Sequence, residues 1–426
     1  MMRYRDYTFN NGAKLRYAKN NISKTTKVDI SFDCGARCDT IEGIAHFTEH
    51  MFFTGTKQLN KSEITKKYYD FINVNAYTSP FKIWFSGDVF TKEFSDYISL
   101  VYSMITESTF SKDAVAKELK VVQQEIVRKS DKHDFWADIF NEYQVTQNSL
   151  WKCGALGTKE SVATIQSKDV KKFVKKYFIA NNLEVYVTSP LSFSKVRKIV
   201  NEKLASKLQI DNKFKPLPLF MGYLLDKPFY ELKQVDIKKN YIFINFPINR
   251  TYQDIEFAKK IGLVLSMMNN GGEGLMKSLR LEKSLVYSAH FSLSLNDKNG
   301  LVTLHTNCDK ENVNEVLRTV ANYLKEIEEK GFTLEQLNNE KRKIDYRKDN
   351  AEPSSNSCHN KLFDYKFFGK LLNKKKLDKI TRNTTLEECN QLFKEVFTNP
   401  TVSLSVYGNI SKNELMKQKE FNEMFK

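Results

Sequence analysis

The chain has 426 residues, which is enough for two or three domains with sizeable hydrophobic cores. Its composition is 41% hydrophobic and 28% charged, which is typical of a globular protein and excludes a disordered or collagen-like one. The 67 basic and 51 acidic residues give a net charge of +16, which we attribute mainly to solvated lysine-rich faces; the functional alternative is an electropositive chamber that favours acidic peptides.

Nucleic acids and membranes are not expected partners. The lysines are dispersed, and no basic stretch is interleaved with aromatic residues as in nucleic-acid recognition modules. The N-terminus lacks the apolar segment of a secretory signal, and no apolar run approaches the ~18 residues that suggest a membrane span. The six cysteines do not have the spacing of a disulfide scaffold, so we expect a reducing, cytoplasmic environment.

The first segment with recognisable chemistry reads His46-Phe47-Thr48-Glu49-His50. On a helix, two histidines four residues apart project from the same face, and Glu49 lies beside them. Two neutral imidazoles can hold zinc, and a carboxylate that is not a ligand can accept a proton from zinc-bound water. The order His-x-x-Glu-His is the signature of the inverzincins. A pattern of five residues occurs by chance, so the prediction of a zinc site requires a third ligand.

A later helix supplies candidates for that ligand. Ser111 is a good N-cap, and an apolar stripe at helical spacing follows it, made of Val115, Leu119, Val122 and Ile126. Glu118 and Glu125 are seven residues apart and share a face at the edge of this stripe, where a carboxylate is costly unless it is paired or bound to metal. Considered alone, the two glutamates would be interpreted as solvated residues on an amphipathic helix. Because two candidate histidine ligands precede them in the chain, a zinc site with two histidines, one glutamate and an open position is the better interpretation.

The sequence also contains an internal repeat. Strand-like runs such as 28–32, 83–86 and 241–246 are mixed with helical periodicity, and segments on either side of 208–219 resemble each other at an offset of about 220 residues. Glu340, for example, falls where Glu118 would be. We predict two homologous α+β domains, each a mostly antiparallel sheet with packed helices: 1–207 with the zinc motif, a linker at 208–219, and 220–426 without it, where Arg347 stands near the counterpart of Glu125.

Taken together, these motifs resemble the pitrilysin–insulinase family of metallopeptidases, and in particular its shorter, mitochondrial-processing-peptidase-like members. The family's third ligand is a glutamate about 75 residues beyond the second histidine, and a second glutamate seven residues earlier supports the site. The resemblance therefore implies His46, His50 and Glu125 as ligands of one Zn²⁺ per chain, Glu49 as the general base, and Glu118 as a group that orients the ligands.

Two further segments are similar to the family's substrate-binding elements. Asn75, Ala76 and Tyr77 match a strand that pairs with extended substrate in the family, and a strand edge is suited to peptide addition. Arg280 and Tyr287 match an Arg-x₆-Tyr element that reaches the substrate near the scissile bond, where both side chains can donate to an oxyanion. Ser284 stands between them where the family usually has glycine.

The resemblance implies a zinc-dependent endopeptidase that hydrolyses short unfolded peptides, or leader and targeting segments, inside an enclosed chamber. Because the family's complete enzyme has four such domains in a clamshell, this chain is expected to form a homodimer, or a heterodimer with a related subunit, in which the Arg/Tyr element faces the partner's zinc. The alternative is a catalytically silent scaffold or partner subunit of the same fold, against which the complete ligand set argues.

The remaining cysteines and histidines receive structural interpretations. The strand-like surroundings of Cys34 and Cys38, and the lack of a second cysteine pair, favour two packing residues over a metal clip. No matching ligand partners are apparent for the other histidines, which we expect to be ordinary surface or core residues: His133, His290, His305 and His359.

Overall fold

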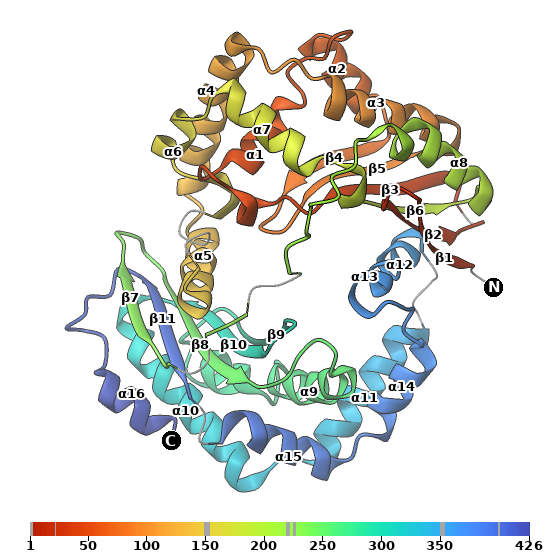
Figure 1. Ribbon diagram of the computed structural model, residues 1–426. Coiled ribbons are helices and arrows are strands. Elements are labelled where there is room, and N and C mark those ends of the chain that lie inside the picture. The colour runs from red at the N-terminus through yellow and green to blue at the C-terminus, as the bar shows by residue number, and fades with distance from the viewer. Residues whose placement is uncertain are drawn as a thin grey trace. The chain divides into compact units, whose positions relative to one another are not determined.

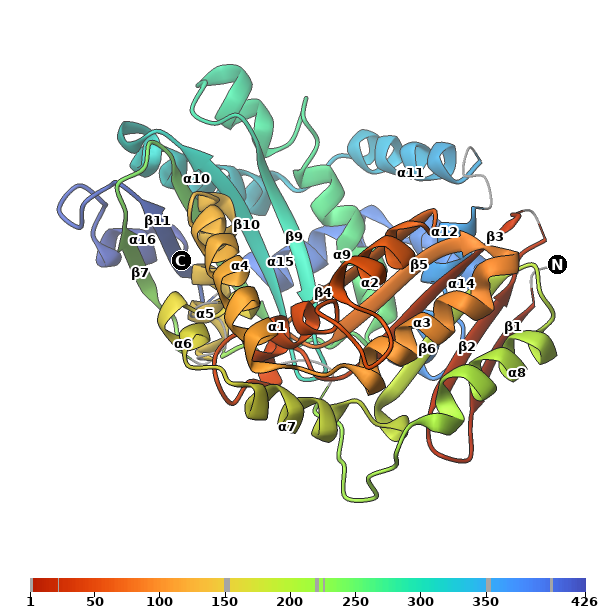
Figure 2. The same cartoon turned by 90° about the horizontal axis from the view of Figure 1, so that it is seen from above.

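The computed structural model describes residues 3–21, 23–148, 154–218, 222–224, 227–349, 354–398 and 401–426. The chain folds into two compact units, whose elements are labelled in Figures 1 and 2. The first unit contains Met1–Lys132, Lys152–Pro218 and Glu352–Leu372, and the second contains His133–Trp151, Leu219–Ala351 and Asn373–Lys426. None of the described helices is both long enough and apolar enough to cross a bilayer.

The first unit is built on a six-stranded sheet in the order β1-β2-β6-β3-β5-β4. Neighbouring strands are antiparallel except β2 and β6, as the mostly antiparallel prediction requires. Every residue of β6 is buried, whereas β4 alternates between exposed and half-buried residues at the edge of the sheet. The strands are Tyr4–Thr8 (β1), Lys14–Lys19 (β2), Thr25–Phe32 (β3), Asn73–Thr78 (β4), Ile83–Phe90 (β5) and Leu183–Ser189 (β6).

Helices cover both faces of this sheet (Figure 1). On one face, Tyr97 of α3 fills the space beside Gly87 of β5, and on the other face Phe363 of α13 contacts Trp84 of the same strand, as the alternation of a pleated strand requires. The helices of the first unit are α1 (Ile44–Met51), α2 (Lys61–Tyr69), α3 (Phe94–Glu107), α4 (Lys112–Ser130), α6 (Lys159–Ala163), α7 (Ser167–Tyr177), α8 (Phe193–Lys203), α12 (Ser355–Asn360) and α13 (Phe363–Phe368).

The second unit has a five-stranded sheet in the order β7-β11-β8-β10-β9. Only β7 and β11 are parallel, so this sheet repeats the pairing of β2-β6-β3-β5-β4 strand for strand, and the predicted duplication and fold class are confirmed. The strands are Tyr230–Gln234 (β7), Asn240–Ile248 (β8), Ala289–Leu295 (β9), Gly300–Cys308 (β10) and Ser403–Gly408 (β11).

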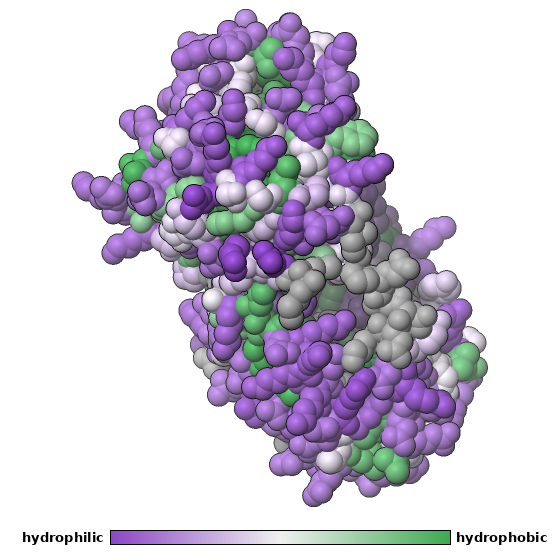
Figure 3. Space-filling view, turned by 90° about the vertical axis from the view of Figure 1, so that its right-hand side faces the viewer, coloured by the Kyte–Doolittle hydropathy of each residue, from purple (hydrophilic) through white to green (hydrophobic). Residues whose placement is uncertain are grey.

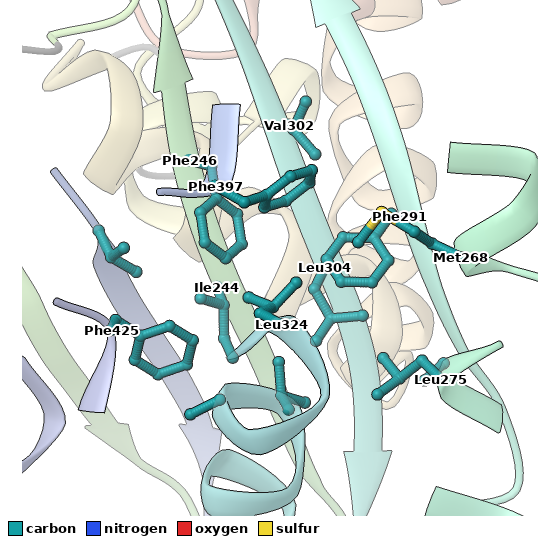
Figure 4. Close-up of a cluster of buried hydrophobic side chains, with 14 of the residues drawn as sticks. Ile244, Phe246, Met268, Leu275, Phe291, Val302, Leu304, Leu324, Phe397 and Phe425 are labelled. Atoms are coloured by element: carbon teal, nitrogen blue, oxygen red, sulfur yellow. The ribbon is translucent and has the colours of Figure 1, made fainter. Parts of the chain in front are cut away.

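The core of the second unit lies between one face of its sheet and its longest helices. Phe246, Phe291 and Phe397 meet there with aliphatic side chains from the strands and helices (Figure 4). The helices are α5 (His133–Thr146), α9 (Ile255–Met268), α10 (Val313–Lys330), α11 (Leu334–Asp349), α14 (Lys374–Asn383), α15 (Leu386–Phe397) and α16 (Gln418–Met424). Hydrophilic side chains cover most of the molecular face shown in Figure 3.

The compact units differ from the continuous halves 1–207 and 220–426, because each half gives one segment to the other unit. α5 of the first half packs on the second sheet, where Ala137 contacts Phe243 and Tyr407. α12 and α13 of the second half pack on the first sheet. The two segments are about 220 residues apart, so they occupy equivalent places in the repeat. The predicted linker at 208–219 lies in the first unit as far as Pro218, and residue 219 is outside the described residues.

A buried ionic cluster fixes α13 to the first sheet. Lys366 Nζ lies 2.8 Å from Glu184 Oε2, Arg16 lies 3.2 Å from Glu184 Oε1, and Lys82 contacts the same carboxylate and lies 2.9 Å from Asp33 Oδ1. Although burial would raise the pKa of Glu184, the three cations hold it well below its usual range. Charges buried in this way are tolerated because they are paired.

Removing the central carboxylate should therefore unfold this unit more easily. Glu184→Gln leaves three buried cations facing Asp33, and we expect the free energy of unfolding, measured by urea denaturation, to fall by about 3–5 kcal/mol. The matched control is Glu202→Gln on α8, where the side chain is 54% exposed; this substitution should change the free energy of unfolding by less than about 0.5 kcal/mol. Equal effects of the two substitutions would contradict a stabilising role for the cluster.

Candidate metal centre

Local contacts before α1 determine where the His-x-x-Glu-His helix begins. Gly43 precedes it with φ 89°, and a Cβ at Gly43 would lie 2.6 Å from the carbonyl oxygen of Leu156, so only glycine fits. The carboxylate of Asp39 accepts hydrogen bonds from the backbone N–H groups of Gly43 (2.7 Å) and Ala45 (3.0 Å). Asp39 thus satisfies amides that a helix start leaves without partners.

The structure brings the three predicted ligands together. Glu125 Oε2 lies 3.4 Å from His50 Nε2 and 3.7 Å from His46 Nε2. Among the described residues these three form the one cluster of potential metal ligands, with their ligand atoms within 4.8 Å of one another. α4 begins at the predicted N-cap Ser111, whose hydroxyl accepts a hydrogen bond from Ala114 N, and it carries Glu125 to the two histidines of α1.

The donor set fits a zinc ion. Separations of 3.4 and 3.7 Å are long for a nitrogen–oxygen hydrogen bond, but they are near the ~3.3–3.5 Å edge of a tetrahedron built with zinc–ligand bonds of about 2.0–2.2 Å. Burial and the neighbouring His50 lower the pKa of His46 to about 4, which keeps its imidazole in the neutral, metal-binding form. Two imidazoles and one carboxylate leave one tetrahedral position open, as catalytic zinc sites do.

Glu118 and Lys61 orient the second histidine. His50 Nδ1 donates to Glu118 Oε1 at 3.1 Å, which leaves Nε2 to face Glu125. Lys61 Nζ, at the start of α2, donates to Glu118 Oε2 at 2.6 Å. Burial would lower the pKa of His50, but the carboxylates of Glu118 and Glu125 raise it to about 9, so a bound metal must displace a proton there. Nothing in the sequence pointed to Lys61, because a single lysine in a lysine-rich chain carries no local signal.

Glu49 lies beside the ligand cluster and is not part of it. Its side chain is buried, with 8% of its surface exposed, and Oε2 accepts a hydrogen bond from Thr78 Oγ1 at 2.8 Å. Burial raises the pKa of Glu49 even though this hydrogen bond lowers it. A buried carboxylate with a raised pKa is suited to accepting and returning a proton.

The predicted substrate strand is the edge strand β4. It pairs with β5 only, so the other side of its backbone is unpaired among the described residues. Asn75 is exposed and Ala76 half-buried. Tyr77 is 41% exposed, and its ring is stacked on Trp84 with centroids 6.0 Å apart.

Arg280 and Tyr287 belong to the second unit. Arg280 lies in the short helical segment η7 (Lys277–Glu282), and its guanidinium carbon is 4.7 Å from the centre of the Tyr287 ring. Both side chains are exposed, Tyr287 by 76%. Ser284 has φ 54°, the left-handed conformation that glycine prefers, so the structure explains why glycine is usual at this position and shows that serine adopts the same conformation here.

The second unit keeps the framework of the site without its ligands. Glu340, the counterpart of Glu118, is 2% exposed and accepts hydrogen bonds from Ser266 Oγ at 2.5 Å, Asn270 Nδ2 at 3.4 Å and Lys343 Nζ at 2.7 Å. At the repeat offset of about 220, Ser266 and Asn270 stand where His46 and His50 stand in the first half. The side chain of Arg347 lies outside the described residues.

Among the described residues, the other cysteines and histidines are not members of the ligand cluster. Cys34 and Cys38 are buried, and each thiol points to a backbone carbonyl. The described cysteines are free, and Cys153 is outside the described residues. His359 is a core residue between Asp29 Oδ2 (3.0 Å) and Thr188 Oγ1 (3.1 Å). The remaining histidines belong to the second unit: His133, His290 and His305.

Two family models match the chain. Residues 16–151 match the insulinase family (peptidase family M16), and residues 164–344 match the peptidase M16 inactive domain. The chain is 25% identical over 406 residues to an uncharacterized zinc protease, YmxG, of Bacillus subtilis, covering 92% of this chain and 95% of that protein. It is 21% identical over 415 residues to a non-peptidase homolog, YmxG, of Helicobacter pylori, covering 93% and 92%.

A solved structure has the same fold. The first half of the periplasmic protease PqqL from Escherichia coli matches with a TM-score of 0.80 and 13% identity, covering 99% of this chain and 96% of that chain. The match spans both units, so the chain has the fold of the first half of that protein.

Metal analysis tests the proposed ligand set without any assay of activity. We expect about one zinc per chain in the wild type and none in Glu125→Ala, because two histidines alone hold zinc weakly. Glu118→Ala should still bind one zinc at saturation, with a dissociation constant raised by about 10–100-fold in chelator competition. Glu202→Ala is the surface control. Unchanged zinc content in Glu125→Ala would show that another residue is the third ligand.

Proposed function

The chain belongs to the M16, or insulinase, family of peptidases, and we propose that it is a zinc-dependent endopeptidase. The observation that carries this proposal is the convergence of His46 Nε2, His50 Nε2 and Glu125 Oε2, with the buried carboxylate of Glu49 beside them and outside the ligand set. A purely structural metal site would require neither the open fourth position nor the adjacent base.

The chemistry follows from the residues around that position. A zinc ion held by His46, His50 and Glu125 would polarise the substrate carbonyl and lower the pKa of a water molecule. Glu49 removes a proton from the water that attacks the carbonyl carbon, and it delivers this proton to the leaving nitrogen as the carbon–nitrogen bond breaks. Because Thr78 occupies Glu49 Oε2, the oxygen that handles the proton is Oε1.

The substrates that suit this site are extended segments. The unpaired edge of β4 offers backbone donors and acceptors to a peptide that can add as a further strand, and Thr78 at its end contacts Glu49. A folded substrate would have its backbone groups already paired. We therefore propose short unfolded peptides, or leader and targeting segments, as substrates, and Asn75, Ala76 and Tyr77 as the residues that bind them.

We further propose that the active enzyme is a dimer. Arg280 and Tyr287 are exposed and lie side by side, and both are donors suited to a developing oxyanion. The chain has one zinc-binding half and one half without ligands, and the matched protease structure is half of a longer protein. In a homodimer the Arg/Tyr pair of one chain would complete the zinc site of the other; a related partner subunit would serve the same purpose.

The second candidate function is a catalytically silent scaffold or partner subunit. The description of the C-terminal family model as an inactive domain and the naming of one relative as a non-peptidase homolog favour it. The presence of all three ligands in one cluster, with the buried carboxylate of Glu49 beside it, favours the peptidase.

Replacing the base separates these two functions. Glu49→Gln keeps the shape of the side chain and its acceptor oxygen but cannot take a proton, so we expect zinc content to stay at wild type while kcat on an unfolded peptide pool falls by about 10²–10⁴-fold. Cleavage products would be followed by mass spectrometry. Equal cleavage by wild type and variant would contradict Glu49 as the base, and no cleavage by either at full zinc loading would favour the scaffold.

Mixing inactive chains tests the shared site. In a mixed dimer of Glu49→Gln and Arg280→Ala chains, one of the two sites has an intact base and an intact arginine. Random exchange should therefore restore about a quarter of the wild-type activity. If mixed dimers form, as judged by native mass spectrometry, and remain as inactive as either parent, the shared-site model is wrong.

A further inference from the structure

Glu49 is the group in the candidate site whose orientation depends most on a single contact. The carboxylate is nearly enclosed, and among the described residues Thr78 is the one side chain that donates a hydrogen bond to it, at 2.8 Å. A buried carboxylate loses its hydration and needs such a donor to stay in one orientation. The hydrogen bonds that join His50, Glu118 and Lys61 involve other atoms and do not replace this one.

Thr78 is itself rigidly held. It is the last residue of β4 and is paired with Ile83 of β5, and the turn beyond it is closed by the hydrogen bond from Ser79 N to the carbonyl oxygen of Lys82 at 2.8 Å. As a β-branched residue it has few side-chain rotamers. Its hydroxyl direction is therefore set by the strand.

Tyr77, the residue before Thr78, packs on the opposite face of β4. Successive side chains of a strand point to opposite faces, so Tyr77 points away from α1 while Thr78 points toward it. Tyr77 is stacked on Trp84, and Trp84 meets Phe363 of α13 edge to face at 5.9 Å. The end of β4 thus lies between Trp84, which α13 backs, and the base on α1, and all of these elements belong to the same unit.

We propose that Thr78 is the positioning residue of the general base. Its hydroxyl occupies Oε2 of Glu49, holds the carboxylate in one rotamer and leaves Oε1 for the proton transfer. The same strand offers its free edge to the peptide, so a peptide that is in register on β4 is also in register with the base. This inference rests on the proposed peptidase activity.

Two complementary substitutions separate the effect of the hydroxyl from that of the packing. Thr78→Val keeps the branched shape and removes the donor, whereas Thr78→Ser keeps the donor and removes a methyl group. We expect Thr78→Val to lower kcat by about 10–100-fold, the value of a hydrogen bond to a charged group, with KM and zinc content unchanged. Thr78→Ser should recover kcat to within about 3-fold of wild type, because the donor is retained. Thr106→Val, on the exposed face of α3, is the control.

Each other outcome is decisive. A rise in KM with unchanged kcat would assign Thr78 to peptide binding alone, and a loss of zinc would assign it to the metal site; either would overturn the inference. So would a Thr78→Ser variant as impaired as Thr78→Val, because the methyl group and not the hydroxyl would then matter. A wild-type chain that carries zinc and cleaves nothing would instead refute the proposed function, whatever the Thr78 variants do.

Discussion

The hydrogen bond from His50 of α1 to Glu118 of α4 joins the two helices that carry the candidate ligands, and the remaining features of the site depend on it. α1 supplies both histidines from adjacent turns, so their mutual distance is a property of the helix alone. The third ligand comes from a different helix, and its approach must be fixed by a contact between helices. Glu118 provides that contact, and it lies two helical turns before Glu125 on the same face of α4. Because Glu118 is buried, its carboxylate must keep its hydrogen-bond partners.

The second half of the repeat shows what the same framework does without a metal. Glu340 is buried like Glu118, but its hydrogen-bond partners differ. Serine, asparagine and lysine side chains donate to Glu340, whereas a histidine and a lysine donate to Glu118. A buried glutamate at this position of the repeat can therefore serve to join helices even where the candidate ligands are absent. The first half combines that use with two imidazoles that converge on Glu125, and this difference decides which half is suited to zinc.

The reciprocal exchange of α5 and α12–α13 gives each unit a helical segment from the other half of the sequence. Each sheet has one face covered by helices of its own half and another covered partly by the exchanged segment. In the first unit that segment is held by buried charges, and Phe363 extends the contact to Trp84 and Tyr77. The second half of the chain thus supports the edge strand β4 of the first, which explains why neither half of the sequence is a compact unit by itself.

Local spacing in the sequence determined the helix with the His-x-x-Glu-His motif, the helix capped by Ser111 and the α+β character of both halves, because helix and strand periodicity dictate which residues share a face. Glu125 and Glu118 were identifiable as a pair for the same reason, and the resemblance to a family assigned their separate roles. Only the tertiary structure revealed that Thr78 holds Glu49, that Lys61 holds Glu118 and that the halves exchange helices. These contacts join residues far apart in the chain, and they depend on the order in which strands pair and on the packing of helices against them, which no local periodicity encodes.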